Sequence, residues 1–415
     1  MITRTIRTIR LAVVASVVLS AAWTQADEIT DLIGQPAVRS ALDAIKATES
    51  EVIRDQIRIC QIAAPPFHEG ERGMAIKTAF ERMGLSNVRI DRVGNVLGQR
   101  PGVTLRPHVV VAAHLDTVFQ ERTDVRVTRE GRFLKGPGIG DNCRGLAVLL
   151  AVAASTAKLP TRGSITFVAD VGEEGLGDLR GMRELFRTTL KDVDQFVSID
   201  GAGLFLTTAG VGSHRYRVTF SGAGGHSYAA FGTPNPIHAM GRAIEKIAQL
   251  NVPAQPKTTF SVGRVSGGTS VNAIASECWM EVDLRSAGAA ELAALTEKFD
   301  RAIDAAVREE NARWTSASGV SAKRELVGDR PAGRTPDEAP IIRRAQLAAR
   351  ALGVSVPQNE SSTDANVPMQ LNIPAVTIGG GGSGSAQHTT NEVFDTTDSW
   401  RGTQFALLLT LALAN

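Results

Sequence analysis

Five side chains that could bind a metal ion recur along the chain, each after an apolar segment or in a glycine-rich turn. Two are imidazoles and three are carboxylates, a set that suits zinc, with cobalt or manganese as possible substitutes. Any one of them alone is more often structural, but their joint appearance in such positions predicts a metal centre. The five residues are His114, Asp141, Glu174, Asp200 and His388.

Two acidic neighbours of these residues could take part in the same chemistry. Glu173 directly precedes Glu174, so one carboxylate could bind metal while the other acts as a general base. Asp116 lies two residues after His114, where its carboxylate could hydrogen-bond the imidazole and fix its tautomer. The pattern therefore favours metal-assisted hydrolysis.

The turn that leads to Asp141 is rich in glycine. Residues 136–140 read Gly-Pro-Gly-Ile-Gly, which lets the backbone turn tightly before the carboxylate. A carboxylate held there could bridge two metal ions about 3.5–4 Å apart. The run lacks the spacing and the strand–helix context of a dinucleotide-binding loop, so we do not interpret it as one.

The elements that must position these residues are short apolar strands that alternate with helices. Each strand ends at or just before a polar residue, and a nearly all-apolar helix is expected over residues 145–157. This alternation predicts an α/β sheet, in which ligands bind at the carboxyl ends of the strands. The expected strands cover residues 108–113, 164–169, 195–199 and 374–378.

The pattern changes within residues 213–327. Alternating strands and two amphipathic helices follow one another in the order β-α-β-β-α-β, which is typical of a ferredoxin-like unit. We interpret this segment as a domain inserted into the first one. The predicted catalytic domain is then discontinuous and comprises residues 27–212 and 328–415.

Composition excludes several other classes of protein. The chain has 415 residues, 43% of them hydrophobic, which argues against wholesale disorder. Its 45 Lys and Arg nearly balance 43 Asp and Glu, so bulk charge gives no support to nucleic-acid binding. Cys60, Cys143 and Cys278 are too few and too scattered for a disulfide framework.

Residues 1–26 have the pattern of a secretory signal peptide. Arginines within the first ten residues precede a short apolar run, and Thr24-Gln25-Ala26 offers a cleavage site. The apolar run is shorter than the roughly 20 residues of a comfortable membrane span, although an uncleaved anchor is the alternative. We expect a secreted or periplasmic protein with no stable membrane insertion after cleavage.

Taken together, these motifs resemble those of the co-catalytic zinc exopeptidase and deacylase family. That family includes glutamate carboxypeptidase, peptidase T, acetylornithine deacetylase and succinyl-diaminopimelate desuccinylase. The resemblance covers nearly the whole mature chain in the expected order, and the peptidase T-like branch is the most similar. The motifs that carry it lie at residues 114–118, 136–142, 173–174, 198–200 and 388–392.

The resemblance implies two zinc ions per subunit and a role for each residue of the site. Glu173 is implied as the general base, and Asp116 as the residue that orients His114. The reaction would be hydrolysis through a metal-bound hydroxide. The implied ligands are His114 and Asp200 for one ion, Glu174 and His388 for the other, and Asp141 bridging both.

The inserted segment resembles the family's lid and dimerisation domain, so a homodimer is expected. Within it, His226 matches a residue that helps to hold the substrate carbonyl oxygen. Asn272 and Arg285 match positions that bind the substrate carboxylate, for which an arginine fork is well suited. Without the resemblance, a capping His, a turn Asn and a salt-bridged Arg would be the simpler readings.

The expected function is hydrolysis of one amide bond in a small peptide or an N-acyl amino acid. A tripeptide aminopeptidase is the alternative to a carboxypeptidase or deacylase, and a non-catalytic binding protein of the same fold is the remaining one. After Asp141 the chain reads Asn142-Cys143-Arg144, where many members have a lysine, and Cys143 could be sensitive to oxidation. Asp364 lies where members often have an Asp motif, and it receives no role.

Overall fold

The computed structural model describes residues 28–415, so the predicted signal peptide at 1–26 lies outside the described residues. The chain forms two compact units. One comprises the residues up to Thr208 together with Thr335–Asn415, and the other comprises Ala209–Arg334. Among the described residues, no helix combines the length and the apolar character needed to cross a membrane.

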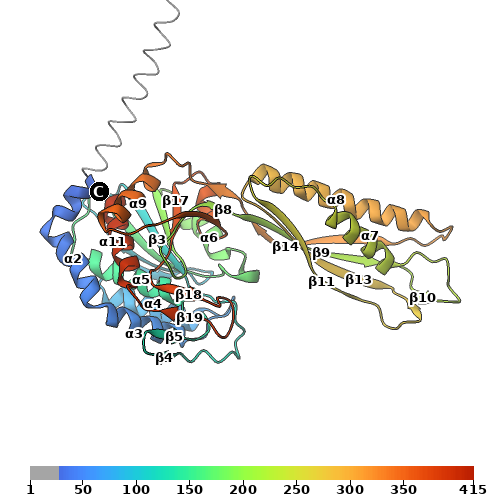
Figure 1. The fold of residues 1–415 in the computed structure, drawn as a ribbon, viewed down its shortest axis with the longest axis horizontal. Coiled ribbons are helices and arrows are strands. Elements are labelled where there is room, and N and C mark those ends of the chain that lie inside the picture. Colours follow the sequence, from blue (N-terminus) through green and yellow to red (C-terminus); the bar gives the residue numbers. More distant parts are fainter. Residues whose placement is uncertain (1–27) are drawn as a thin grey trace, which may run out of the picture. The chain divides into compact units, whose positions relative to one another are not determined.

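The first unit is built on a mixed sheet (Figure 1). Four central strands run parallel, and the strands outside them pair antiparallel. The chain passes into and out of the second unit at β8 and β15. In spatial order the strands are β1 (Ser86–Ile90), β2 (Val96–Arg100), β6 (Ser164–Asp170), β3 (His108–His114), β7 (Gln195–Ile199), β17 (Ala375–Ile378), β8 (Leu206–Gly210) and β15 (Gly333–Arg334), with β16 (Gln358–Ser361) beside β8.

Helices cover both faces of this sheet, because its central strands are apolar on both sides. In β3, Val109 and Val111 pack into the core of one face, and Val110 and Ala112 into that of the other. A short π-helical segment (Leu185–Thr189) and two short helices, α6 (Arg180–Glu184) and α10 (Asn366–Gln370), cover the second face. The first face is covered by α2 (Pro36–Ala47), α3 (Glu49–Cys60), α4 (Gly70–Arg82), α5 (Cys143–Thr156), α9 (Pro340–Ala351) and α11 (Trp400–Ala414).

The parallel strands bring the predicted site residues to one edge. His114 is the last residue of β3 and lies in register with Asp170, the last residue of β6. Asp200 directly follows β7, the other neighbour of β3. Glu173 and Glu174 follow β6, just before a 3-10 turn (Gly175–Gly177). Three of the five predicted ligands, His114, Glu174 and Asp200, therefore lie at the carboxyl ends of these strands.

A small antiparallel sheet brings the remaining two ligand-bearing loops together. Its order is β18 (Ser383–Ser385), β19 (Val393–Asp395), β5 (Phe133–Lys135) and β4 (Thr128–Glu130). His388 lies in the loop between β18 and β19, and Asp141 lies in the loop after β5. Because β19 pairs with β5, these loops start side by side.

The second unit has the predicted β-α-β-β-α-β order. The helices pack on one face of a four-stranded antiparallel sheet, where Phe220, Met280 and Phe299 are fully buried. This arrangement confirms an inserted ferredoxin-like domain. Its elements are β9 (Gly212–Ser221), α7 (Pro236–Ala248), β11 (Thr258–Gly267), β13 (Glu277–Ser286), α8 (Ala289–Ala312) and β14 (Ser321–Arg330), with a two-stranded ladder of β10 (Gly225–His226) and β12 (Ala273–Ile274).

A buried carboxylate on α8 stabilises this second unit. Glu310 accepts hydrogen bonds from the Asn235 amide at 3.0 Å, the Trp314 indole at 3.1 Å and the Arg242 guanidinium at 3.1 Å. Burial alone would raise the pKa of Glu310, but these donors lower it below its ordinary value of 4.5. The charged form is therefore favoured in the folded state.

We expect Glu310→Gln to lower the free energy of unfolding by about 1.5–3 kcal/mol at pH 7, because the Arg242 bond loses its charged acceptor. A depressed carboxyl pKa gives stability above the unfolded pKa that disappears as the pH falls through the folded pKa. The difference between the wild type and the variant should therefore shrink below about pH 4.5. Urea unfolding followed by tryptophan fluorescence at several pH values measures it, and a constant difference would contradict the expectation.

Candidate metal centre

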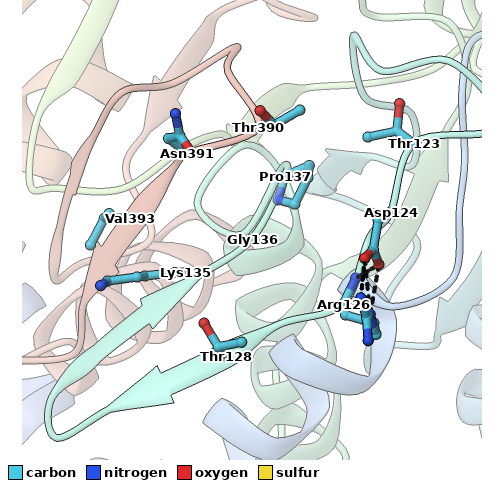
Figure 2. Close-up of a pocket in the computed structure, with 10 residues that line it drawn as sticks. All are labelled: Thr123, Asp124, Arg126, Thr128, Lys135, Gly136, Pro137, Thr390, Asn391 and Val393. Atoms are coloured by element: carbon cyan, nitrogen blue, oxygen red, sulfur yellow. Dashed lines mark hydrogen bonds and ion pairs between the residues drawn. The ribbon is translucent and has the colours of Figure 1, made fainter.

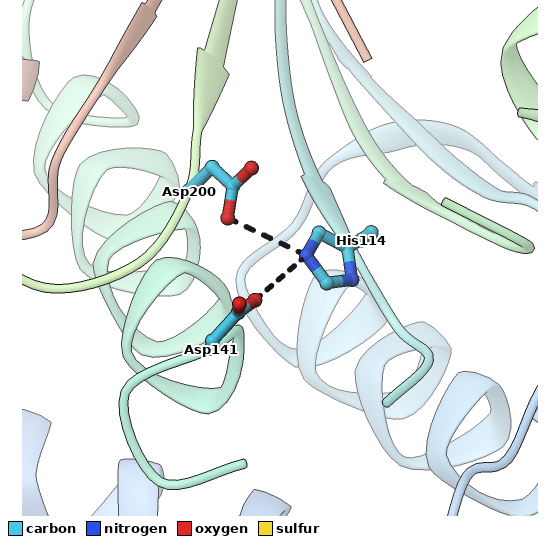
Figure 3. A group of neighbouring side chains, drawn as sticks. All are labelled: His114, Asp141 and Asp200. Atoms are coloured by element: carbon cyan, nitrogen blue, oxygen red, sulfur yellow. Dashed lines mark ion pairs between the residues drawn. The ribbon is translucent and has the colours of Figure 1, made fainter. Parts of the chain in front are cut away.

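Three predicted ligands from separate elements converge at the end of β3. The Nε2 atom of His114 lies 3.2 Å from Asp141 Oδ1 and 3.5 Å from Asp200 Oδ1. Figure 3 shows both carboxylates directed at this one ring nitrogen. The His114 side chain is almost fully buried, whereas the two aspartates are 14% and 17% exposed. This is one complete group of nitrogen and oxygen donors.

A second group shares Asp141 with the first. Its other oxygen, Oδ2, lies 3.1 Å from His388 Nε2, and the same nitrogen lies 3.0 Å from Glu174 Oε1. In each group the donor atoms lie within 4.8 Å of one another. Asp141 is therefore the residue that joins two adjacent three-ligand groups.

The charges of this cluster call for a cation. Burial by itself would lower the pKa of His114, but three neighbouring aspartates raise it well above its ordinary value. Asp141 and Glu174 raise the pKa of His388 to about 10. Burial would raise the pKa of Asp141, yet the two histidines hold it well below its usual range. The negative charge of the carboxylates around both imidazoles therefore favours a cation at this place.

Unsatisfied atoms at the centre of the cluster fit a metal. His114 Nε2 and Asp141 Oδ1 are buried without a hydrogen-bond partner in the described part of the chain, although they lie 3.2 Å apart. Buried polar atoms normally have hydrogen-bond partners. Two such atoms that face each other without one therefore indicate a binding position for a ligand. The mixed imidazole and carboxylate donors suit a borderline divalent ion such as zinc.

Asp116 holds the backbone of the turn that carries the paired glutamates. Asp116 is fully buried, and its two oxygens accept the amide hydrogens of Glu173 at 3.0 Å and of Glu174 at 2.8 Å. Both glutamates are themselves buried. A carboxylate oxygen of each lies within 4.8 Å of a His114 ring nitrogen. Asp116 therefore fixes the turn that places both acids at the centre.

The contact between Asp116 and His114 differs from the expected one. His114 Nδ1 hydrogen-bonds the backbone carbonyl of Asp116 at 3.1 Å, whereas the carboxylate is 3.6 Å away. The carboxylate is occupied by the two backbone amides described above, so it reaches the imidazole only as a charge. The carbonyl sets the tautomer, leaving Nε2 for the centre.

Asn142, the residue after Asp141, connects two loops of the site. Its Oδ1 caps α5 by accepting the Gly145 amide hydrogen at 3.0 Å and also accepts that of Gly201 at 3.2 Å. Its Nδ2 donates to the Ile199 carbonyl at 2.9 Å. One side chain thus ties the residue after Asp141 to both neighbours of Asp200.

Two further buried carboxyls lie behind the site, and the sequence pattern did not identify them as a pair. No oxygen of Asp170 or Asp364 has a hydrogen-bond donor within residues 28–415. Burial raises the pKa of Asp170 to about 7, and burial next to Asp170 raises that of Asp364 well above its usual value. Burial therefore disfavours the charged form of both carboxyls. Asp364, to which the sequence assigned no role, belongs to this pair.

Cys143 lies in the core beneath the site rather than at its surface. It is fully buried together with Cys60, and both belong to a small apolar cluster with Phe394. Burial raises the pKa of the Cys60 thiol. Cys60 also donates to the Pro137 carbonyl at 3.3 Å. The thiols therefore help to pack the turn that leads to Asp141.

A pocket of about 610 Å³ is lined by residues that follow His114 and His388 and residues that precede Asp141 in the chain (Figure 2). Its charged side chains are already paired, Arg126 with Asp124 and Lys135 with Glu130 at 2.8 Å. Seven of its ten lining residues have polar or charged side chains. The lining consists of Thr123, Asp124, Arg126, Thr128, Lys135, Gly136, Pro137, Thr390, Asn391 and Val393.

The three predicted substrate-binding residues all lie in the second unit, but not together. His226 and Asn272 meet at the β10–β12 ladder, where the Ser227 amide donates to the Asn272 carbonyl at 2.9 Å. Arg285 lies near the other end of β13, where its Nε contacts Asp283 at 2.6 Å. The structure brings His226 beside Asn272 and separates Arg285 from both.

Comparisons with known proteins agree with this architecture. Residues 95–219 match the profile of peptidase family M28, and residues 208–311 match a peptidase dimerisation domain. A succinyl-diaminopimelate desuccinylase from Nitrosospira multiformis is 27% identical over 285 residues, which cover 63% of this chain and 74% of that protein.

Solved structures extend the likeness to most of the chain. The aminopeptidase PepT from Bacillus cereus has a TM-score of 0.71 at 20% identity and covers 88% of this chain and 98% of its own. A dinuclear metal-binding peptidase of the M20 family from Bacillus subtilis has a TM-score of 0.67 at 18% identity, with 89% and 99% covered. At such identities these two likenesses show a shared fold.

Proposed function

We propose that this chain, as a member of the co-catalytic metallopeptidase and deacylase family that includes succinyl-diaminopimelate desuccinylase and peptidase T, hydrolyses one amide bond of a small peptide or N-acyl amino acid with two zinc ions. That it is a metallopeptidase or amidohydrolase follows from its relatives. One observation carries the finer proposal. Asp141 joins two groups of three donors, and the acidic pair Glu173-Glu174 opens onto the same centre.

In this proposal each buried acid has a separate task. Asp141, with His114 and Asp200 on one side and Glu174 and His388 on the other, would hold the two ions. When bound, such ions polarise an amide carbonyl and lower the pKa of a water molecule.

Glu173 would take a proton from the attacking water on its carboxylate and return it to the leaving amine. Its backbone amide is fixed by Asp116, which limits the positions that its carboxylate can reach. Glu174 is held by the same aspartate, so the base and the neighbouring ligand keep a constant spacing. The turn thus aligns a proton acceptor with the place where water is activated.

The end of the substrate that is recognised depends on Arg285. Its Nε is bound to Asp283, which leaves its terminal nitrogens to receive a free carboxylate. This favours a carboxypeptidase or deacylase. A tripeptide aminopeptidase is the second candidate, because Arg285 lies apart from the His226–Asn272 ladder rather than with it.

One tripeptide in three forms separates these candidates. We would incubate the zinc-loaded protein with the free, N-acetylated and C-amidated peptide and identify the products by mass. Cleavage that tolerates N-acetylation but not amidation is expected if Arg285 holds the carboxylate. Cleavage that tolerates amidation but not N-acetylation would identify an aminopeptidase and would remove that role from Arg285. No cleavage of any form would count against amide hydrolysis.

Two further properties belong to the same proposal. Export rests on the signal-like residues 1–26, and the N-terminal mass of the secreted protein tests cleavage after Ala26. Homodimerisation through the second unit rests on the match of residues 208–311 to a peptidase dimerisation domain. Light scattering of the purified protein measures the mass of the assembly.

A further inference from the structure

A buried carboxylate outside the ligand set holds the backbone that carries Asp141. Glu392 is 1% exposed, and its Oε1 accepts the amide hydrogens of Gly140 at 2.9 Å and Asp141 at 3.0 Å. Its Oε2 accepts the amide hydrogen of Gly138 at 2.9 Å. Three amides in four residues therefore converge on one side chain.

Glu392 also connects the two loops that bear the shared ligand and the second histidine. It lies four residues after His388, and its own carbonyl accepts the Gly136 amide hydrogen at 3.0 Å. Backbone and side chain together make four hydrogen bonds from this one residue to the turn before Asp141. A displacement of either loop would therefore also move the other.

The carboxylate approaches residue 140 so closely that a larger residue there would displace it. A Cβ atom built there would lie 2.9 Å from Glu392 Oε1, a separation that real Cβ contacts essentially never show. Its other neighbours, Ala202 and Phe394, would remain at ordinary contact distances of 3.6 Å and 4.0 Å. The backbone of Gly140 is not in the left-handed region, so alanine is allowed there except for its contact with the carboxylate.

Stability of the turn alone does not explain why the hydrogen bonds of the Glu392 carboxylate include the amide of Asp141. Placing a second buried carboxylate beside Asp141 adds like charge, which is unfavourable unless backbone dipoles compensate for it. The three amides offset part of that cost, and they fix the peptide from which Asp141 extends. The two Asp141 oxygens must face different histidines, 3.2 Å and 3.1 Å away, so the orientation of this peptide matters.

We propose that Glu392 is a positioning residue of the metal centre, whose carboxylate orients the Asp141 backbone so that one oxygen serves each group of ligands. The inference rests on the proposed function only in that Asp141 holds metal. It assigns Glu392 no contact with substrate or metal. Its consequence is that metal affinity depends on a side chain that is not a ligand.

Two variants test the contact between the Glu392 carboxylate and the backbone of Gly140, because each changes one of the two residues. Glu392→Gln replaces one acceptor oxygen with an NH₂ group that faces a backbone donor, and Gly140→Ala pushes the carboxylate away without changing it. For both we expect zinc affinity to fall about 10- to 100-fold, as is usual when an outer partner of a ligand is lost. Calorimetric titration of the chelator-treated protein with zinc chloride measures it without any substrate.

Glu310→Gln provides a matched control, because Glu310 is another buried carboxylate that accepts a backbone amide, but in the second unit. It should lose stability and keep wild-type zinc affinity. The proposal is overturned if Glu392→Gln, or Gly140→Ala where the former does not fold, binds two ions as tightly as the wild type. A wild-type protein that binds no zinc would instead refute the proposed function.

Discussion

Glu173→Gln is expected to lower kcat about 10²- to 10⁴-fold while both metal ions stay bound, because it removes the proton acceptor and no ligand. The amide side chain has nearly the same shape as the carboxylate. The backbone amide that Asp116 holds is unchanged, so the turn keeps its geometry. The rate is measured with whichever peptide form the wild type cleaves, and the metal content by elemental analysis of the same sample.

The adjacent residue supplies the matched control. Glu174→Gln makes the same replacement of a carboxylate by an amide at the next residue. It changes the group whose Oε1 lies 3.0 Å from His388 Nε2. The variant should lose metal from that group of ligands and lose activity as a consequence. If Glu173→Gln turned over substrate at the wild-type rate, or lost metal as Glu174→Gln does, the separate tasks of the two glutamates would be wrong.

The location of the site could be predicted because strand direction follows from local pattern. Residues 108–113 form an apolar run that is followed at once by His114, and residues 195–199 are followed by Asp200. Parallel strands place their carboxyl ends at one edge of a sheet, so both residues were expected at that edge, although the pairing of the two strands comes from the structure. Local hydrophobicity was sufficient for this step.

The supporting contacts could not be predicted, since they depend on long-range pairing. Asp170 and Asp364 meet only after β6 and the segment before α10 have packed, and no local pattern reports that contact. Glu392 lies in the motif at residues 388–392, but the backbone amides that it binds are more than 250 residues away in the chain. A buried acid with distant backbone partners looks, in sequence, like any surface acid.

The second unit shows the same limit in a different form. Its order of elements was readable from periodicity, and the fold class is confirmed. The relation between His226 and Asn272 arises from a two-residue ladder, which is too short to leave a periodic signal. Arg285 follows Asn272 by 13 positions, yet the intervening β13 carries it to the opposite end of a strand. Proximity along the chain is therefore a poor guide to proximity in a sheet.

Asp141→Asn should remove both metal ions, a larger effect than the loss of any other single ligand. Its two oxygens face His114 and His388 separately, and it is the one residue present in both of these groups. An amide has one oxygen and no negative charge, so one group loses its donor and the other keeps only a neutral oxygen, which weakens both groups. Elemental analysis after dialysis, and zinc titration of the variant, measure the loss.

Asp200→Asn is the contrasting variant, because Asp200 lies 3.5 Å from His114 and belongs to one of the two groups that contain Asp141. It should weaken one ion and leave the other. Chelation of the wild type should reproduce the inactivity of Asp141→Asn, but zinc addition should restore only the wild type. Retention of two tightly bound ions by Asp141→Asn would mean that the groups are independent, and the shared carboxylate could then not be what couples them into one centre.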